Sequence, residues 1–269
     1  MRIAVVPATY NRPDMLTALL EGYLAQDYRD FEIIIADDGS GEATSEVITR
    51  YQRCAPFRIA HVWQENRGYR AATIRNKAVA QANADYVIFT DQDCIPRPDF
   101  LSSHARLAER GWFVAGNRVL LAENFSRHVA ANSGSIHDLK FAQWLYRMIH
   151  GDINRIQPLI KLPDGVWRKL HPARWRGAKT CNLAVWHDDL VDVNGMDESY
   201  SGWGLEDSDL VIRLIHSGVG HKSGRYACPV FHLWHRESSR DDLEANRLRL
   251  QQVLNSTHIR AAQGLDQYC

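Results

Sequence analysis

The chain has 269 residues, of which 45% are hydrophobic and 24% are charged, as expected for a soluble globular protein with a sizeable core. Its 32 basic and 32 acidic residues cancel, so the net charge gives no support to nucleic-acid binding. Residues 1–6 lack the apolar length of a signal peptide, and no apolar run approaches the roughly 18–20 residues that span a bilayer.

The first half of the sequence alternates between strand and helix patterns. Apolar runs predict strands at 2–6, 31–36, 57–63 and 86–90, and helical spacing predicts helices at 13–26, 42–53 and 70–82. This alternation predicts βαβ units, and hence an α/β fold with a mostly parallel central sheet flanked by helices. Ligands of such sheets bind beyond the carboxyl ends of the strands, where residues 7–12, 37–40 and 91–93 would lie.

Polar residues follow the first two strands. Pro13 fits the first turn of a helix, and the N-terminus of that helix is favourable for anions. After the second strand, the carboxylates of Asp37 and Asp38 could accept a hydrogen bond from a ring N–H of uracil, with a nearby hydroxyl holding ribose. The same residues also fit a turn in which Ser40 caps the next helix.

Basic residues follow the third strand. Those at 66–68 and 75–77 either place a cation near a diphosphate or form a solvated helix face.

The fourth strand ends in Asp91, Gln92 and Asp93. Carboxylate oxygens suit hard divalent ions, so Asp93, with Asp91 bound directly or through water, would hold Mg²⁺ or Mn²⁺ against a diphosphate. The metal would stabilise the charge of the leaving nucleotide diphosphate as a Lewis acid. The alternative is a polar turn, which the motif alone would favour. The position after an apolar strand weakens that alternative, and the presence of the other motifs favours the metal site.

The pattern loosens at 135–179, where basic and aromatic residues accumulate, most densely from 140 to 179. This bias is typical of a surface that contacts a membrane or an anionic acceptor. A solvated loop whose tryptophans pack inward explains it equally well.

Regular patterns return with an expected strand at 182–186, a helix at 205–217, a strand at 230–234 and a polar helix at 241–254. Before the first of these helices, a tryptophan lies between two glycines and three acids follow. Glycines let a ligand approach the backbone, a tryptophan suits stacking on a sugar ring, and a carboxylate can act as general base on a hydroxyl. The residues concerned are Trp203, Gly204, Glu206, Asp207 and Asp209.

His232 and His235 are further candidate metal ligands, since imidazole binds Mn²⁺ acceptably. Residues i and i+3 of a strand face opposite sides, so we expect one ligand, His235, rather than both. The alternative is that both histidines are structural.

With these motifs, the chain resembles family 2 glycosyltransferases of the GT-A fold. Its C-terminal segment is similar to that of β-1,4-galactosyltransferase and chondroitin-synthase-type enzymes. The resemblance covers residues 3–235, rests on the order and spacing of the motifs, and is weakest at 120–179. It implies a nucleotide-diphospho-sugar donor, a glycan or glycolipid acceptor, a Mn²⁺ or Mg²⁺ cofactor, and inversion at the anomeric centre.

The resemblance also implies roles for individual residues. Residues in the family's donor motifs would bind the nucleotide sugar, and among them Asp38 would meet the base. The donor-binding residues would be Pro7, Thr9, Asn11, Arg12, Asp37, Asp38, Arg75, Asn76, Asp91 and Gln92.

The acceptor element of the family corresponds to 194–198 and 202–209. There Asp207 would be the general base, Glu206 would bind the acceptor, and Trp203 would line the sugar site beside Gly204 and Asp209. The metal would be held by Asp93 and His235, with Asp91 and His232 as further candidates. The segment 135–179 has no counterpart, so the acceptor is not carried over.

We expect one GT-A catalytic domain over 1–269, with a donor half at 1–118, an acceptor half at 119–240 and a C-terminal helix and tail at 241–269. The expected reaction is transfer of a UDP-linked sugar of the galactose, N-acetylgalactosamine or glucose type, in synthesis of a bacterial surface polysaccharide or lipopolysaccharide. A nucleotidyltransferase would need a glycine-rich loop, which residues 8–11 lack. A non-catalytic glycan-binding module would not need these carboxylates together.

The five cysteines are widely spaced and form no Cys-x-x-Cys pair, which argues against a disulfide framework and a zinc site. We therefore expect free thiols and a cytoplasmic protein, either free or at the inner face of the membrane.

Overall fold

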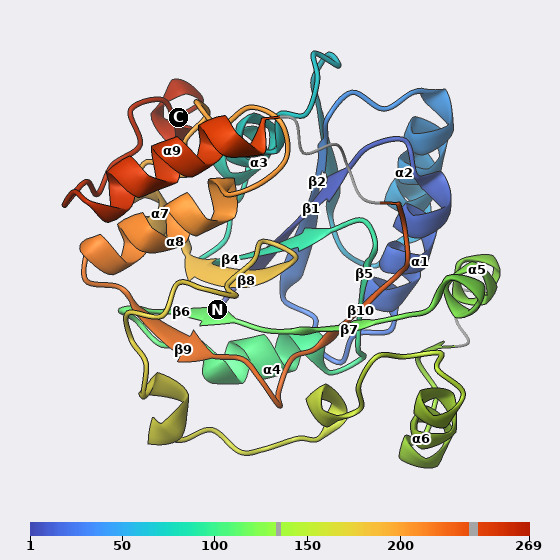
Figure 1. Ribbon diagram of the computed structural model, residues 1–269. Helices are drawn as coiled ribbons and strands as arrows, with labels where there is room; N and C mark the ends of the chain where they lie inside the picture. Colours follow the sequence, from blue (N-terminus) through green and yellow to red (C-terminus); the bar gives the residue numbers. More distant parts are fainter. Residues whose placement is uncertain (133–135, 237–241) are drawn as a thin grey trace.

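The computed structural model describes residues 1–132, 136–236 and 242–269 (Figure 1). In this part of the chain, the central sheet has the strand order β3 (Ile59–Trp63), β2 (Phe31–Asp37), β1 (Ile3–Thr9), β4 (Tyr86–Asp91), β8 (Asn182–Trp186), β6 (Trp112–Ala115) and β9 (Gly220–Ser223). A second, smaller sheet consists of β5 (Cys94–Pro96), β10 (Val230–His232) and β7 (Arg118–Leu120).

The strand directions explain where a ligand can bind. β3, β2, β1 and β4 are parallel, because α1 (Pro13–Leu24), α2 (Glu42–Cys54) and α3 (Ala71–Ala80) connect them. β8 is antiparallel to both β4 and β6, and β9 is parallel to β6. It follows that β6 and β9 run in the same direction as β4, and that their carboxyl ends lie at the same edge of the sheet.

Helices cover both faces of the central sheet (Figure 1). One core cluster joins the sheet to α1, α2 and α4 (Phe100–Leu107), and the other joins it to α3, α7 (His187–Asp192) and α8 (Glu206–His216). Burial on both faces explains why β2 and β4 read as continuous apolar runs. The helix α9 (Leu243–Leu254) packs on α8. The GT-A architecture, a mostly parallel sheet between helical layers, is thus confirmed.

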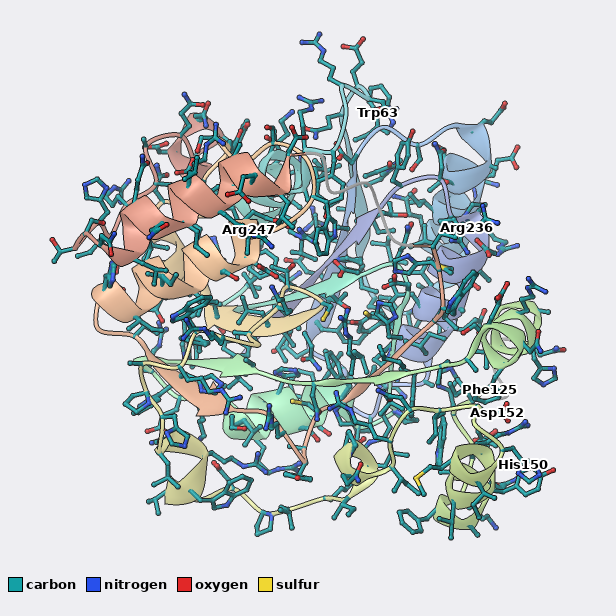
Figure 2. The ribbon with its side chains drawn as sticks, viewed as in Figure 1. Trp63, Phe125, His150, Asp152, Arg236 and Arg247 are labelled. Carbon is teal, nitrogen blue, oxygen red and sulfur yellow. The ribbon has the colours of Figure 1, made fainter. Side chains whose placement is uncertain are left out.

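A third core cluster joins the second sheet to α5 (Glu123–Ala131) and α6 (Phe141–Ile149). Trp144 of α6 stacks on Phe231 with a centroid distance of 4.5 Å, and the Arg147 guanidinium lies over the Phe125 ring. Arg147 also pairs with Asp152 at 3.0 Å, in the region where Figure 2 labels Phe125 and Asp152. The loosely patterned middle of the sequence is therefore anchored to the second sheet.

Several element boundaries differ from those expected. The helix expected at 13–26 ends at Leu24, that at 42–53 extends to Cys54, and that at 70–82 spans only Ala71–Ala80. The strand expected at 57–63 begins at Ile59, and that at 230–234 ends at His232. Residue 135 of the basic segment and residue 241 of the last expected helix lie outside the described residues.

The elements not expected from the sequence are short. β5, β6, β7 and β9 have three or four residues each, too few to show a period, and α4 to α7 were also missed. Short helical turns occur at Gln157–Leu159, Val166–Lys169 and Leu265–Gln267. None of the described helices is long and apolar enough to cross a membrane.

Candidate active site

The carboxyl ends of the parallel strands border a cavity of about 1060 Å³, which we call the main cavity. β1 lies between β2 and β4, with Ala8 opposite both Ala36 and Asp91, so the strand-end segments meet here. The structure therefore brings together donor, metal and acceptor candidates that are far apart in sequence. The predicted residues that line the main cavity are Thr9, Arg12, Asp38, Arg75, Asp91, Gln92, Asp93, Trp203, His232 and His235.

Asp93 lies beside two imidazoles. Its Oδ2 is 2.8 Å from Nε2 of His235 and 3.5 Å from Nε2 of His232. The expectation that the two histidines face opposite sides is wrong, because β10 ends at His232 and the chain beyond it does not keep the alternation of a strand. The hydrogen bond to Asp93 raises the pKa of His235, whereas burial lowers the pKa of His232.

The chemistry of these groups fits a divalent metal ion. Ligand atoms of Asp93, Cys94 and His232 all lie within 4.8 Å of one another, and Asp91 is at the end of the preceding strand, β4. Carboxylates suit Mg²⁺ and Mn²⁺, while imidazole is a poor ligand for Mg²⁺, which prefers oxygen. The mixture therefore favours Mn²⁺ if either histidine binds the metal.

Arg75 lines the main cavity and lies between Asp91 and the first turn of α8. Its Nη2 donates to Asp91 Oδ1 at 2.6 Å, and its Nη1 lies 3.7 Å from Glu206 Oε1. Burial raises the pKa of Asp91; the charge of Arg75 opposes this effect and that of Asp93 adds to it. The guanidinium of Arg75 thus contacts two carboxylates that belong to different motifs.

The two acids at the end of β2 have different positions. Asp38 lines the main cavity, and its carboxylate accepts hydrogen bonds from Gln64 Nε2 at 2.6 Å and from the backbone N–H of Arg70 at 2.8 Å. Asp37 is fully buried and binds His61 and the backbone N–H of Ser40, both at 2.8 Å. Asp37 therefore shapes the loop, while Asp38 is presented to a ligand.

Other predicted donor residues hold these loops in place. Ser40 does not cap α2, which begins at Glu42; its Oγ instead accepts the backbone N–H of Asn11 at 2.9 Å. Asn11 Oδ1 in turn accepts the N–H of Gly41 at 2.9 Å. Asn11 has a φ of +47°, a value that asparagine tolerates better than most residues. Asn11 therefore ties the first donor loop to the second.

Within the first loop, the Thr9 hydroxyl donates to Gln92 Oε1 at 2.6 Å, which fixes the loop to the Asp-Gln-Asp turn. Arg12 lines the cavity and pairs with Asp14 at 3.2 Å. Pro7 is buried inside β1 and does not line the cavity.

Asn76 lies on the other side of α3 from the main cavity. Its Nδ2 donates to Met196 O at 2.8 Å and to Glu198 Oε1 at 2.9 Å, and its Oδ1 accepts the N–H of Met196 at 2.8 Å. The side chain is 1% exposed, so these contacts leave no surface for a donor. Asn76 joins α3 to the Asn-Gly-Met-Asp turn of the acceptor element.

Glu206 and Asp207 occupy the first turn of α8; both are buried, and neither they nor Gly204 are among the residues that line the main cavity. Lys179 Nζ lies 3.3 Å from Asp207 Oδ1, and the Ser208 hydroxyl donates to the same oxygen at 3.2 Å. Burial raises the pKa of Glu206 to about 7, the charge of Asp207 adds to the shift, and Arg75 opposes it. A helix N-terminus normally favours a carboxylate, but here the desolvation outweighs that effect.

The Gly-Trp-Gly turn has a conformation that depends on its glycines. Gly202 has a φ of +68° and Gly204 of +107°, and Leu205 also has a positive φ, of +77°. Trp203 is 38% exposed and lines the main cavity. Asn246 of α9 holds the turn, because its Nδ2 donates to Ser201 O at 2.9 Å and to Gly204 O at 3.0 Å.

The structure does not bring Asp209 to the cavity. Its carboxylate is completely buried and pairs with Arg213 at 2.7 Å, one turn further along α8. Arg213 also donates to the carbonyls of Val193 and Gly195. We therefore assign Asp209 to packing rather than to the acceptor site.

Some residues near the site were not predicted. Tyr69 lines the main cavity, and Lys179 pairs with the candidate base. Gln64 binds Asp38, and Asn246 supports the tryptophan turn. Tyr69 follows Gly68 and could have been suspected from that neighbour, whereas the other three contacts are long-range and leave no local pattern.

The basic middle segment is not one continuous surface. Lys161 pairs with Asp99 and Lys169 with Glu109, while Arg168 donates to the carbonyls of Leu162, Ser223 and Arg225. These basic side chains form ion pairs and hydrogen bonds within the protein, and the structure gives no support to the expected membrane contact.

Comparisons with known proteins agree with this geometry. Residues 4–150 match the family described as glycosyl transferase family 2, and residues 168–236 match that described as the N-terminal domain of galactosyltransferase. A validoxylamine A glucosyltransferase of Streptomyces hygroscopicus subsp. jinggangensis is 30% identical over 226 residues, 81% of this chain and 52% of that protein. The chondroitin synthase of Escherichia coli is 26% identical over 82% of this chain and 33% of its own length.

Two solved structures illustrate the shared fold. Residues 1–349 of TarS from S. aureus in complex with UDP superpose with a TM-score of 0.63 at 14% identity, over 100% of this chain and 68% of that one. The mannosyltransferase PcManGT of Pyrobaculum calidifontis, in complex with GDP-Man and Mn²⁺, gives 0.60 at 18% identity, over 95% and 62%. The chain spans about half the length of its Streptomyces relatives.

Proposed function

The chain belongs to glycosyl transferase family 2, and on that premise we propose that it is an inverting, metal-dependent glycosyltransferase. It would move a sugar from a nucleotide-diphospho-sugar to a hydroxyl of a glycan or glycolipid acceptor. The observation that carries the proposal is the meeting, across Arg75, of the Asp-Gln-Asp turn of β4 with the acids that begin α8. Candidates for the donor side and for the acceptor side thus contact the same side chain.

The donor side would consist mainly of residues 1–118. Asp38, presented at the end of β2, would accept a hydrogen bond from the base, and Thr9, Arg12 and Gln92 would surround the diphosphate. Asp93 and His235, with Asp91 and His232 as further candidates, would hold Mn²⁺ or Mg²⁺. A bound metal ion would withdraw charge from the leaving diphosphate as a Lewis acid. We favour UDP because the structurally similar TarS is known in complex with UDP.

The acceptor side would consist of residues 119–240, completed by the C-terminal helix and tail at 241–269. Trp203 would stack on the sugar, and Glu206 would bind an acceptor hydroxyl. Asp207 would take the proton of the attacking acceptor hydroxyl. At the same time the hydroxyl oxygen would bond to the anomeric carbon, and the bond from that carbon to the diphosphate would break. Attack from the opposite face inverts that carbon, so one base suffices.

The biological setting that we propose is assembly of a bacterial surface polysaccharide or lipopolysaccharide. The similarity to chondroitin synthases of Escherichia coli and Pasteurella multocida supports a polysaccharide product. The galactose, N-acetylgalactosamine and glucose series are the donor sugars to test first.

The first test uses UDP, GDP, CMP and TDP, each with and without Mn²⁺, in a thermal-shift assay, followed by hydrolysis of UDP-sugars. UDP should raise the melting temperature in a Mn²⁺-dependent way, since selective binding stabilises the native state. In the Asp207→Asn variant, hydrolysis should fall by about 10²–10⁴-fold because the general base is lost, while the UDP shift stays unchanged. Asp192→Asn, at an exposed position of α7, is the matched control.

Undiminished hydrolysis in the Asp207→Asn variant would contradict the assignment of the base. A shift with GDP instead of UDP would move the donor to the GDP-sugars. No shift with any nucleotide would favour a glycan-binding module, and release of diphosphate from a nucleoside triphosphate would favour a nucleotidyltransferase.

A further inference from the structure

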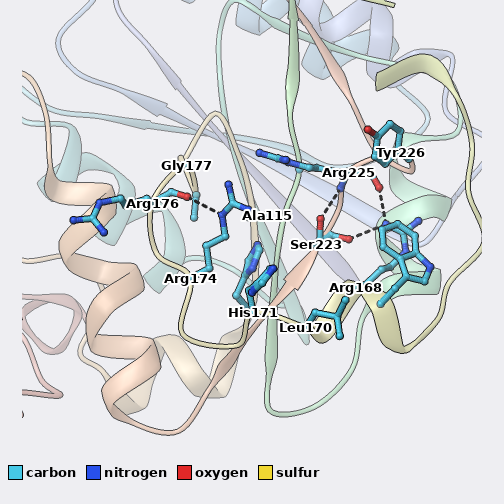
Figure 3. Close-up of a pocket in the computed structure, with 14 residues that line it drawn as sticks. Ala115, Arg168, Leu170, His171, Arg174, Arg176, Gly177, Ser223, Arg225 and Tyr226 are labelled. Atoms are coloured by element: carbon cyan, nitrogen blue, oxygen red, sulfur yellow. Dashed lines mark hydrogen bonds between the residues drawn. The ribbon is translucent and has the colours of Figure 1, made fainter. Parts of the chain in front are cut away.

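A second cavity, of about 220 Å³, lies at the carboxyl ends of β6 and β9 (Figure 3). We call it the basic cavity, because its charged lining is cationic and no aspartate or glutamate is among the described residues that line it. The cationic and titratable lining residues are Arg168, His171, Arg174, Arg176, His221 and Arg225.

These arginines do not all serve the same purpose. Arg168 is buried and donates to backbone carbonyls, among them Ser223 O at 2.8 Å, so it fixes the wall of the cavity. Arg168 also lies 3.6 Å from the carboxylate of Asp164. Arg174 and Arg225 are exposed, and neither has a carboxylate partner in the described parts of the chain; Arg174 donates to the carbonyl of Arg176. In Figure 3 their guanidinium groups point toward the same space, whereas that of Arg176 points away.

Other basic residues near this cavity do have carboxylate partners. Lys169 and Lys222, close in sequence to the cavity walls, both pair with Glu109. Two guanidinium groups that face one space without such a partner repel each other, and a bound anion would remove the repulsion. Guanidinium groups also offer paired N–H donors that match the oxygens of a phosphate or carboxylate.

The basic cavity opens at the same edge of the sheet as the main cavity, since β6 and β9 run in the direction of β4. By strand spacing, β6 is roughly 10 Å and β9 roughly 14 Å from β4. One short segment joins the two cavities, because Gly116 lines the basic cavity and Arg118 lines the main one. Gly177, which also lines the basic cavity, lies two residues before Lys179, the ion-pair partner of Asp207.

We propose that the basic cavity is a subsite for an anionic group of the acceptor, a phosphate or a carboxylate borne by the glycan near the hydroxyl that is extended. The inference rests on the proposed function and deepens it, because it assigns the acceptor to the polyanionic glycans. Arg174 and Arg225 bind the anion, and Arg168 positions the strand end that carries Arg225.

The test is calorimetric binding of three probes to the full chain: glycerol 3-phosphate, a trimer of galacturonate and the neutral maltotriose, with UDP and Mn²⁺ present to occupy the main cavity. An anionic probe should bind more tightly than maltotriose, and less tightly as salt rises. The Arg174→Gln/Arg225→Gln variant should bind it at least about tenfold more weakly, since it loses hydrogen bonds to a charged group. Arg53→Gln/Arg247→Gln removes the same charge at exposed sites on α2 and α9 and should leave affinity unchanged.

Equal affinity of the wild type and the Arg174→Gln/Arg225→Gln variant for both anions would overturn the subsite, as would binding no tighter than that of maltotriose. Glycerol 3-phosphate binding alone would identify a phosphorylated acceptor, and galacturonate binding alone a uronic-acid acceptor. The UDP thermal shift, measured on the same samples, separates the two proposals. A normal shift without anion binding contradicts the subsite alone; anion binding without any shift contradicts the donor site alone.

Discussion

The acids at the start of α8 show how one run of sequence gives three chemically different residues. Glu206, Asp207 and Asp209 lie within four positions, and the sequence suggested that all of them meet a ligand. Each residue of a helix is turned about 100° from the last, so Asp209 points inward to Arg213. Asp207 remains beside the half-exposed Lys179, and Glu206 lies in an environment that disfavours its charge.

Glu206 makes stability depend on pH. Its pKa is about 7 in the folded protein, against an ordinary value of 4.5, so the folded state keeps a proton that the unfolded chain releases between these values. The free energy of unfolding should therefore fall as pH rises from about 4.5 to about 7, by up to roughly 1.4 kcal/mol per pH unit. The glutamine of the Glu206→Gln variant carries no charge at any pH, so this fall in the free energy of unfolding should be absent from that variant.

Melting temperatures across that pH range, with a chelator present to exclude metal effects, measure the difference. The melting temperature of Glu206→Gln relative to wild type should increase steadily with pH. Glu46→Gln, at an exposed position of α2, should run parallel to wild type. Parallel curves for Glu206→Gln as well would show that the carboxyl of Glu206 titrates alike in both states.

At the scale of elements, the sequence predicted the parallel half of the sheet because its strands are long, buried on both faces and separated by amphipathic helices. It missed β5 and β7 of the second sheet, which are three residues long, and it misplaced the end of β10. That end matters because it lets His232 and His235 both approach Asp93. The contact of α9 with the tryptophan turn is also long-range, so no local sequence pattern predicts it.

The anchor from α9 should matter for stability and for acceptor use. Asn246→Ala removes two hydrogen bonds to the carbonyls of Ser201 and Gly204, a loss of about 1–3 kcal/mol. For a protein of this size that corresponds to a fall in melting temperature of roughly 2–4 °C per kcal/mol. The UDP-induced shift should persist, because Asn246 does not line the main cavity.

Gln251→Ala, at an exposed position of the same helix, is the matched control and should melt like wild type. An unchanged melting temperature for Asn246→Ala would mean that the tryptophan turn keeps its conformation without α9.

For the whole molecule, the order of motifs along the chain was enough to predict the fold and the meeting of strand ends at one cavity, because parallel strands end at a common edge. It was not enough to separate residues that face a ligand from residues that join the two proposed halves. Arg75 and Asn76 are neighbours, and the resemblance gave both the same role. Successive positions on α3 instead turn Arg75 to Asp91 and Asn76 to Met196.

This pair allows the donor site and the junction between the halves to be tested separately. Asn76→Ala leaves the N–H and the carbonyl of Met196 without their side-chain partner in a buried setting, so it should lower stability by roughly 1–3 kcal/mol. The affinity of the folded protein for UDP with Mn²⁺ should stay within about twofold of wild type, a change below roughly 0.4 kcal/mol.

Arg75→Gln should instead weaken that affinity by about tenfold or more, since it removes the cation that pairs with Asp91. Melting curves give the stability change of both variants, and calorimetric titration with UDP below the melting range gives the affinity. Loss of UDP affinity in Asn76→Ala equal to that in Arg75→Gln, with an unchanged melting temperature, would return Asn76 to the donor site. A lower melting temperature with unchanged UDP affinity in Asn76→Ala would make Asn76 the residue that holds the acceptor turn at a fixed distance from the donor.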